Sequence, residues 1–385
     1  MPEKETNERR STVDWERYRR EFPIVARYIY FNHAAVSPFS TRVREAVESV
    51  SENLLRHGYL CAEELFGRAD EVRNAAARLI GGESEEIAFT KNTTQGVLIV
   101  ANGIHWRSGD NIVMPSIEFP ANAYPWIALS LRGVEIRMVE PDEGKVTAEM
   151  LADACDQRTR VITTSFVQFS TGYRIDLTEL GDFCKHRGMY LHVDGIQALG
   201  MIDCDVKKLK IDFLSTGGQK WLLAMPGAGF FYCRKELLDE IDVWNPGWSS
   251  VAERWDFLNY DLTFRDSAGR FEEGSLNFHA IFALGASIDM FLEIGMPQVE
   301  ERILSLTDSL ARGLEDRGYE VTSPRRSGEH SGIICFVHPK RKTEDIQKTI
   351  SDAGVVCGIR EGAIRLSPHF YNNEEDVEKF LALLP

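Results

Sequence analysis

The sequence has no paired cysteines, no excess of basic residues and no long apolar run. Its seven cysteines are widely scattered and form no CxxC pair, a pattern that fits a reducing compartment and lacks the usual spacing of zinc ligands. The net charge of -15 argues against a nucleic-acid partner, because a phosphate backbone is bound by clustered lysine and arginine. No apolar stretch approaches the ~20 residues that span a bilayer, and residues 1–22 lack the apolar core of a secretory signal. We therefore expect a cytoplasmic protein with no nucleic-acid, membrane or metal partner.

Length and composition indicate a globular protein of two or three units. A chain of 385 residues exceeds what one small core organises, and 43% hydrophobic with 27% charged residues excludes a disordered or fibrous chain. No repeat, low-complexity tract or flexible linker divides the sequence. In residues 41–56, the residues Val43, Val47, Val50 and Leu54 follow a helical period, which predicts a helix with one apolar face.

Short β-rich runs alternate with helical ones through the middle of the chain. Such alternation predicts a mostly parallel sheet with helices on both faces, and ligands in these sheets lie beyond the carboxyl ends of the strands. A predicted helix, Leu177–Gly188, ends at a glycine and is followed directly by a strand. The predicted strands are Asn111–Pro115, Val161–Phe166, Met189–Val193, Phe213–Ser215 and Gly229–Cys233.

After residue 280 the pattern changes to that of an α+β unit. Two long helical stretches, Ala280–Gly295 and Gln298–Arg317, precede the run GIICFVH, a further helix, the strand pair VVCGI and AIRLS, and a last helix from Glu374. We place the large domain at residues 30–289. The small domain then comprises residues 1–29 and 290–385, with the N-terminal residues packed against the C-terminal part.

A lysine and an aspartate follow successive predicted strands. In HVDGIQA the strand ends at Asp194, and STGGQKW places Lys220 after the next strand. A carboxylate can keep a ring nitrogen protonated, and a lysine nearby can hold pyridoxal phosphate, so the pair is the arrangement that this cofactor needs. Alone, Lys220 is better explained as an ordinary turn lysine, and Asp194 as the aspartate of an Asp-Gly turn.

Two further segments fit a cofactor of this kind. FTKNTTQGVLIVA joins a strand to an apolar helix through small hydroxyl residues, which places free backbone N–H groups at a helix start, where phosphate binds. Thr93 has a simpler alternative role as the cap of that helix. Phe119 follows the strand Asn111–Pro115 and can lie flat against an aromatic ring, although a role in the core explains it equally well.

Together these segments resemble the class V aminotransferase family of pyridoxal-phosphate enzymes, which includes cysteine desulfurases, selenocysteine lyase, kynureninase and isopenicillin N epimerase-like proteins. The similarity runs from YIYFNHAAVSP to YNNEEDVEKF, and HVDGIQA followed by GGQKW is its most specific part. The resemblance implies fold type I, with a mostly parallel seven-stranded sheet in the large domain and a smaller C-terminal α+β domain. It also implies pyridoxal 5'-phosphate as cofactor and a homodimer.

The resemblance assigns roles around the cofactor ring. It implies that Lys220 forms the Schiff base and moves the α-proton, and that Asp194 pairs with the pyridinium nitrogen. Gln197, together with Gln168, matches the residues that hydrogen-bond the phenolic oxygen, and Phe119 matches the aromatic residue that stacks on the ring.

The resemblance also assigns the phosphate and substrate contacts. Thr93 and Thr94 match the phosphate loop, and Gln219 stands where many members have a phosphate-binding histidine. Ser275 matches a hydroxyl residue that reaches the phosphate of the neighbouring subunit. Arg365 matches the arginine that holds the substrate carboxylate, a task suited to its planar fork; a surface ion pair is the simpler alternative.

The departures from the family pattern bear on the reaction. Gly217 occupies a position that is often a phosphate-binding serine, and Gln219 removes a titrating group beside the phosphate. Cysteine desulfurases carry a nucleophilic cysteine between two arginines; here Arg360 and Arg365 enclose only the residues EGAI. Cys357 precedes this loop in the run VVCGI, where we expect it to pack as a small apolar residue.

His33, in FNHAA, is a second candidate acid–base and substrate-binding residue, with a histidine satisfied by backbone contacts as the equal alternative. We expect an enzyme that acts on an amino acid or amine through an external aldimine, by transamination or β-elimination of the C–S lyase type. Cysteine desulfuration and epimerisation are the alternatives, and a non-catalytic binding or regulatory protein is the alternative from another class. Loop 244–264, rich in aromatic residues, suggests an apolar pocket wall or a dimer contact.

Overall fold

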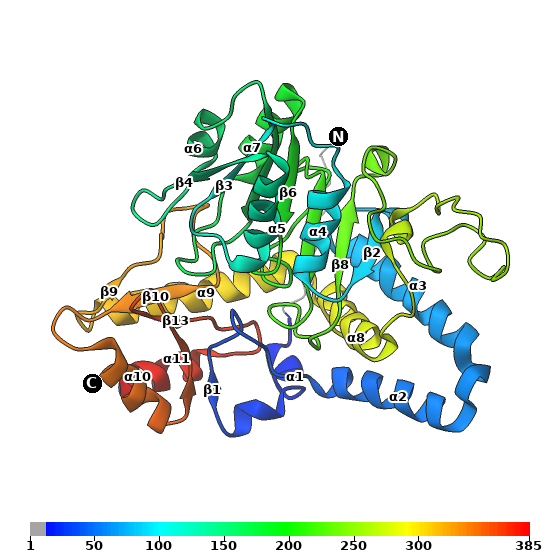
Figure 1. The fold of residues 1–385 in the computed structure, drawn as a ribbon. Coiled ribbons are helices and arrows are strands. Elements are labelled where there is room, and N and C mark those ends of the chain that lie inside the picture. The colour runs from blue at the N-terminus through cyan, green and yellow to red at the C-terminus, as the bar shows by residue number, and fades with distance from the viewer. Residues whose placement is uncertain (1–12) are drawn as a thin grey trace, which may run out of the picture.

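A seven-stranded sheet forms the upper layer of the protein in Figure 1, where the computed structural model describes residues 13–385. The antiparallel strand β8 lies between β2 and β7, and all other neighbours are parallel. The predicted mostly parallel α/β sheet is therefore confirmed. In sheet order the strands are β2 (Ile87–Thr90), β8 (Gly229–Cys233), β7 (Phe213–Gly217), β6 (Tyr190–Asp194), β5 (Thr159–Ser165), β3 (Asn111–Pro115) and β4 (Glu135–Val139).

The sheet has an apolar core on each face because neighbouring residues of its strands point to opposite sides. In β5, Val161 packs into one core and Ile162 into the other. Helix α4 (Thr93–Gly103) covers the first face and α7 (Leu177–Arg187) covers the second. Short helices α5 (Tyr124–Ile127) and α6 (Ala148–Asp153) complete these layers (Figure 1).

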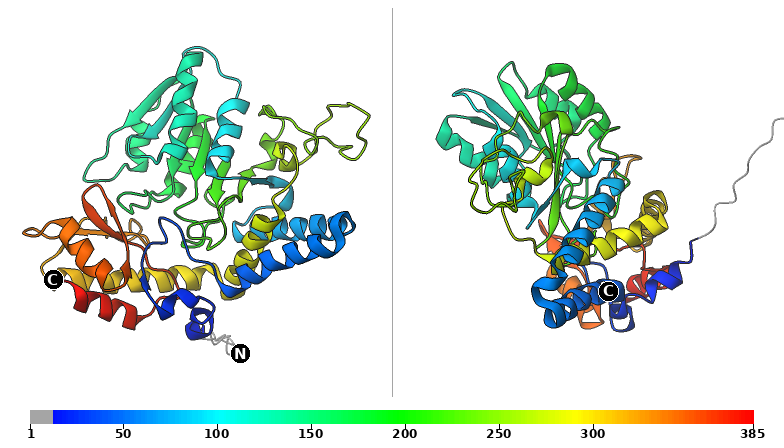
Figure 2. Two further views of the ribbon diagram at one scale, coloured as in Figure 1. Left: turned by 60° about the horizontal axis from the view of Figure 1, so that its bottom comes forward. Right: turned by 90° about the vertical axis from the view of Figure 1, so that its right-hand side faces the viewer.

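Three long helices extend along one side of the sheet layer. Helices α2 (Thr41–His57) and α3 (Ala62–Leu79), blue in Figure 2, both pack against α8 (Phe278–Ile294). The predicted apolar face of α2 is only partly buried: Val43 and Val50 are fully covered, whereas Leu54 is 39% exposed. The last turns of α2 are mostly exposed.

The C-terminal part is a smaller layer built on α9 (Met296–Glu315). An antiparallel sheet of order β12-β13-β10-β9 packs with α10 and α11. The placement of the domain boundary near residue 290 remains a prediction; α8 continues to Ile294 and α9 begins at Met296. The further elements are β9 (Glu320–Val321), β10 (Ile334–Val337), α10 (Thr343–Asp352), β12 (Gly358–Arg360), β13 (Ala363–Leu366) and α11 (Glu374–Leu383).

The N-terminal residues lie against this C-terminal layer. In α1 (Trp15–Arg19), Arg19 makes a two-pronged ion pair with Asp376 at 2.7 and 2.9 Å, and Phe22 stacks on Tyr371 with ring centroids 3.9 Å apart. Strand β1 (Ile29–Tyr30) pairs in parallel with β11 (Val355–Val356). Of the predicted small-domain segment 1–29, residues 1–12 lie outside the described residues.

The run VVCGI forms two short strands instead of the single predicted one. Strand β11 pairs in parallel with β1, whereas β12 pairs antiparallel with β13. The chain changes sheets at Cys357, which belongs to neither strand. The switch depends on β1, which lies more than 300 residues away in the sequence, and a local pattern does not reveal it.

Within residues 13–385 no single helix is long and apolar enough to cross a membrane. Helices α8 and α9 meet the criteria of length and composition only as a pair, and they are bent by 86° relative to each other.

Candidate active site

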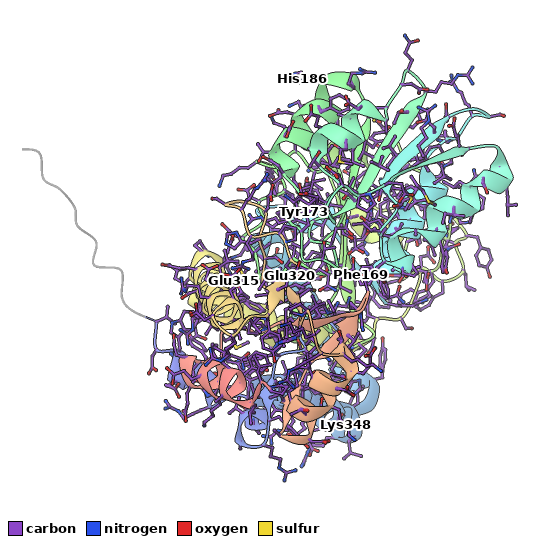
Figure 3. All side chains as sticks on the ribbon, turned by 90° about the vertical axis from the view of Figure 1, so that its left-hand side faces the viewer. Phe169, Tyr173, His186, Glu315, Glu320 and Lys348 are labelled. Carbon is purple, nitrogen blue, oxygen red and sulfur yellow. The ribbon has the colours of Figure 1, made fainter. Side chains whose placement is uncertain are left out.

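The candidate site lies at the carboxyl ends of β5, β6 and β7, where the sheet layer faces the C-terminal part. Ser165, Asp194 and Ser215 are aligned in register across these strands. Phe169, labelled in Figure 3, lies at this junction, and its carbonyl oxygen accepts a hydrogen bond of 2.7 Å from Arg365 Nη1. The segments that contain Asp194 and Lys220, from the large sheet, therefore meet Arg365, from β13 (Ala363–Leu366) of the C-terminal sheet.

Asp194 is a buried acid with one oxygen left without a partner. Its side chain is 1% exposed, Oδ1 accepts a hydrogen bond from the Ile196 N–H at 2.9 Å, and Oδ2 has no partner. Burial raises the pKa of Asp194 from 3.8 to about 7, and the charge of Glu118 adds to this rise, while Lys220 opposes it. A buried carboxylate in this state favours a cationic hydrogen-bond donor placed against its free oxygen.

Lys220 lies after β7 in a buried turn. Its Nζ is 5.2 Å from the centroid of the Phe119 ring, and the side chain is 9% exposed. Burial lowers the pKa of Lys220 to about 8, with Arg365 and Arg360 acting in the same direction and Asp194 against it. A larger share of this amine than of an ordinary lysine is therefore neutral near neutral pH, and the neutral form is the one that attacks a carbonyl.

The start of α4 supplies unpaired hydroxyl and N–H groups on the same side. Asn92, not Thr93, caps the helix, because its side chain accepts from the Gln95 N–H at 3.0 Å. Thr93 Oγ1 is buried without a partner, as is Thr90 Oγ1. A Cβ on Gly96 would lie 2.5 Å from Ser215 Oγ, so only glycine lets α4 approach β7 this closely. Thr94, in the first turn, is half-buried.

Gln219 and Gln197 place their side-chain amides in different surroundings. A Cβ on Gly217 would lie 2.6 Å from Gln219 Oε1, so the Gln219 amide occupies the space that a side chain at 217 would need. Gln197 donates to the Ala34 carbonyl at 3.0 Å and accepts from Trp221 Nε1 at 2.8 Å. The second amide hydrogen of Gln197 is therefore all that remains for a contact with a ring oxygen.

Glu118 is a buried acid of this site that the sequence reasoning missed. It is 8% exposed and accepts hydrogen bonds from Ser165, Gln168 and Asn122. Gln168 donates through Nε2 at 2.8 Å, which leaves its Oε1 buried without a partner. The available signal was a lone acid in the apolar context of SIEFP, directly before Phe119.

Arg365 is a fully buried arginine with no acidic partner among the described residues. Its side chain is 1% exposed, Nη1 donates to Phe169, and Nε and Nη2 have no partner. Burial and the nearby Arg360 lower the pKa of Arg365 to about 10. Since an isolated buried cation is costly, these two nitrogens form a site for an anion with two oxygens.

His33 is a buried histidine whose two ring nitrogens both have partners. It is fully buried, its Nδ1 lies 2.7 Å from the Ser367 carbonyl, and its Nε2 lies 2.7 Å from the Tyr371 hydroxyl. Burial lowers its pKa to about 3. With both ring nitrogens engaged and no exposed face, the geometry favours the satisfied histidine over the acid–base group.

The segment around His33 connects the two layers. The His33 and Ala34 N–H groups donate to Ser367 at 3.3 and 3.0 Å. At the other end, Ser37 donates to the Gln219 carbonyl at 2.9 Å and to the Lys220 carbonyl at 2.5 Å. Figure 2 shows this blue segment after β1 rising between the C-terminal part and the sheet layer.

Ser275 lies near the start of α4, whereas Cys357 lies in the C-terminal layer. Ser275 is exposed and lines an open cavity of about 300 Å³ that it shares with Lys91 and Gln95 near the start of α4. Cys357 is 8% exposed within the apolar core of the C-terminal layer, and burial raises its pKa to about 12.

The residues present fit pyridoxal phosphate. The unpartnered Asp194 Oδ2 matches a protonated ring nitrogen, and the hydroxyls and N–H groups at the start of α4 match a phosphate. Phe119, 42% exposed, offers a ring face beside Lys220. Within residues 13–385 no cluster of three or more His, Cys, Asp or Glu side chains has the arrangement of a metal site.

Comparison with known proteins gives one consistent result. The family profile described as aminotransferase class-V matches residues 29–380. A probable cysteine desulfurase of Methanothermobacter thermautotrophicus is 29% identical, over 94% of this chain and 95% of its own length. The apo structure of a cysteine desulfurase from Thermococcus onnurineus has a TM-score of 0.88 and 26% identity, covering 97% of this chain and 98% of that one. The cystine C-S lyase C-DES, at 23% identity and a TM-score of 0.87, shares the fold; the match covers 94% of this chain and 98% of C-DES.

Proposed function

Since the chain belongs to the class-V aminotransferase family of pyridoxal-phosphate enzymes, we propose that it acts on an amino acid by β-elimination or transamination. The observation that carries this proposal is the convergence of Lys220 with two unsatisfied buried groups, Asp194 Oδ2 and the free edge of Arg365. When bound, the cofactor supplies an electron sink for the bond broken at the α-carbon.

Arg365 sets the substrate class in this proposal. Its Nε and Nη2 lie on one edge of the guanidinium and are the two donors that bind a carboxylate in a paired fashion. Held there, an α-carboxylate meets a full positive charge in a buried setting. An amino acid satisfies this edge, whereas a simple amine leaves it unpaired.

Lys220 then serves as the base at the α-carbon. Its lowered pKa leaves Nζ able to accept a proton near neutral pH and to return it. Asp194 holds a proton on the ring nitrogen through Oδ2, which burial and the neighbouring Glu118 make a strong acceptor.

The cysteine chemistry separates elimination from desulfuration. A desulfurase needs an activated thiolate on an accessible loop, and residues 361–364 contain no cysteine. Cys357, the nearest in sequence, is buried and its pKa is raised. We therefore favour elimination from a sulfur amino acid, or transamination, over transfer of sulfur to the protein. The second candidate, cysteine desulfurase, is favoured by the names of the relatives.

Incubation of the holoenzyme with cysteine, followed by mass spectrometry of the intact protein, tests this choice. We expect no persulfide on any cysteine and an unchanged rate in Cys357→Ala, with Cys233→Ala, at another buried cysteine, as the control. A persulfide on Cys357 together with an inactive Cys357→Ala variant would assign the protein to the desulfurases.

We also propose that the protein works as a homodimer in the cytoplasm. All seven of its cysteines are free thiols, which persist in that reducing compartment. Exposed apolar side chains on the turn between α2 and α3 support a dimer, because monomers rarely expose a patch of this kind. Loop 244–264 packs on this region through Trp255 and Phe66, whose ring centroids are 5.5 Å apart. The most exposed members are Leu55 (81%), Tyr59 (86%), Leu60 (87%), Leu258 (86%) and Tyr260 (91%).

Sedimentation of the Leu60→Glu variant tests the dimer. We expect this change to shift the protein to monomer, whereas Leu131→Glu, at an equally exposed leucine (91%) outside the patch, leaves the dimer intact. A monomeric wild-type protein at micromolar concentration would refute the proposal.

A further inference from the structure

Glu118 is held by donors on both of its oxygens. Oε1 accepts from the Ser165 N–H at 2.7 Å and from Gln168 Nε2 at 2.8 Å, and Oε2 accepts from Asn122 Nδ2 at 3.0 Å and from Ser165 Oγ at 2.5 Å. Three of these four groups can only donate at this contact, which favours an ionised carboxylate. Burial raises the pKa of Glu118, and the donated hydrogen bonds oppose that rise.

The orientation of Asn122 is fixed from the other side of the network. Trp126 Nε1, which has a hydrogen to give and no lone pair to offer, donates to Asn122 Oδ1 at 3.2 Å. Thr163 Oγ1 donates to the same oxygen at 2.9 Å. The Asn122 amide must therefore present its NH₂ group to Glu118. Trp126 and Thr163 thus fix Asn122 as the hydrogen-bond donor in this contact and Glu118 as the acceptor.

Gln168 is oriented by the same rule. A carboxylate only accepts, so Glu118 selects the NH₂ end of the Gln168 side chain. The Oε1 end, buried and without a partner, is then directed away from Glu118. An oxygen in this position accepts a hydrogen from its ligand and stabilises the form of the ligand that carries the proton.

We propose that Glu118 is a positioning residue of the cofactor site, which holds the Gln168 amide with its oxygen as the free end and adds a second buried negative charge beside Asp194. The inference deepens the proposed function and rests on its placement of the cofactor at Lys220. Both effects act in one direction: they favour the protonated, cationic form of the bound cofactor.

The charged groups around this position are few. Asp194, Arg360 and Arg365 act on Lys220, and Glu118 and Lys220 act on Asp194. No further charged side chain acts on Glu118 to a comparable degree. Glu118 acts on Asp194 and is not among the charges that act on Lys220, so removing its charge would leave Asp194 as the one acid of the described residues beside a cationic ring and would disfavour that cation.

The absorbance of the bound cofactor, titrated with pH, measures this effect directly. In Glu118→Gln we expect the pH midpoint of the colour change to fall by roughly 0.5–1 unit, the size of shift that a nearby charge produces. We expect the affinity for pyridoxal phosphate to fall by about three- to tenfold, as for the loss of one hydrogen bond. The control Glu140→Gln makes the same change in net charge at an exposed acid bonded to Ser116, and should leave both quantities unchanged.

A second variant keeps the test decisive if Glu118→Gln fails to fold. Gln168→Met keeps the size of the side chain and the charge of Glu118 but removes the amide, and we expect a smaller shift of the midpoint in the same direction. If the wild type shows cofactor absorbance but the midpoint is unshifted in a folded Glu118→Gln variant, the inference about Glu118 is wrong and the proposed function stands. An unshifted midpoint in Gln168→Met has the same consequence. A wild type that shows no cofactor absorbance with pyridoxal phosphate overturns the proposed site as well.

Discussion

Replacing Asp194 by asparagine should stabilise the cofactor-free protein while it weakens the holoenzyme. The folded chain raises the pKa of Asp194 from 3.8 to about 7, mainly through burial. A raised pKa contributes stability that is fully present below the unfolded value of 3.8 and is lost as the pH rises through the folded value. Above about pH 7 the ionised carboxylate therefore lowers the free energy of unfolding, and a neutral asparagine removes this cost.

The size of the effect follows from the shift. At about 1.4 kcal/mol per pKa unit, the shift corresponds to an upper limit of about 4 kcal/mol. Asparagine keeps an oxygen for the Ile196 N–H but leaves a buried NH₂ group beside the free Oδ2 position, which costs about 1–3 kcal/mol. We therefore expect apo Asp194→Asn to gain about 1–3 kcal/mol near pH 8, with the gain vanishing around pH 5 and becoming a loss of about 1–3 kcal/mol below about pH 4.

Urea denaturation of the cofactor-free protein measures this gain, with midpoints compared at matched slopes across pH. The matched control is Asp212→Asn, also buried, whose pKa is raised to about 6 and which lies at the opposite end of the strands. It should show a similar dependence on pH without any loss of cofactor affinity. An Asp194→Asn apo protein that is less stable than wild type near pH 8, or a gain that does not depend on pH, would refute the reasoning.

Three further predictions concern the other residues of the site. Lys220→Ala should purify without the absorbance of lysine-bound cofactor and retain cofactor only non-covalently; a borohydride-trapped adduct on another lysine would contradict the assignment. The rate at which the apo protein captures pyridoxal phosphate should rise with pH through about 8, the lowered pKa of Lys220, and a midpoint near the ordinary value of 10.5 would argue against burial of the amine. Arg365→Ala should raise KM by at least ~10-fold with a smaller effect on kcat, because it removes a fork that binds the carboxylate in ground and transition states alike. Arg365→Lys should recover only part of the loss. Unchanged steady-state kinetics would show that Arg365 is not part of the substrate site.

Local patterns predicted the alternation of strands and helices in the large sheet. The predicted strands Asn111–Pro115 and Gly229–Cys233 have the predicted bounds, and the helix from Leu177 ends one residue before the expected glycine. Asp194 and Lys220 could be singled out because each follows a strand in a short motif. Their roles, like those of the other site residues, remain predictions.

Features that depend on distant partners could not be predicted. The role proposed for Glu118 depends on its hydrogen bonds with Ser165 and Gln168, which lie 47 and 50 positions further along the chain. The sequence allows Thr93 as the helix cap, but Asn92 has the extended backbone of the residue before the helix and is the cap. His33 is satisfied by Ser367 and Tyr371, over 330 residues away, and no local pattern distinguishes such a histidine from a catalytic one.

The segment that joins the two layers makes them a single mechanical unit. Residues 33–37 are anchored at one end to Ser367, two residues from Arg365, and at the other to the main chain of Gln219 and Lys220. These hydrogen bonds link the strand that carries Arg365 to the turn that carries the lysine. Under thermodynamic linkage, binding of a carboxylate at Arg365 and binding of the cofactor at Lys220 would change each other's affinity by equal free energies. Substrate binding at Arg365 can thus affect Lys220 through residues 33–37, without any contact between the two side chains.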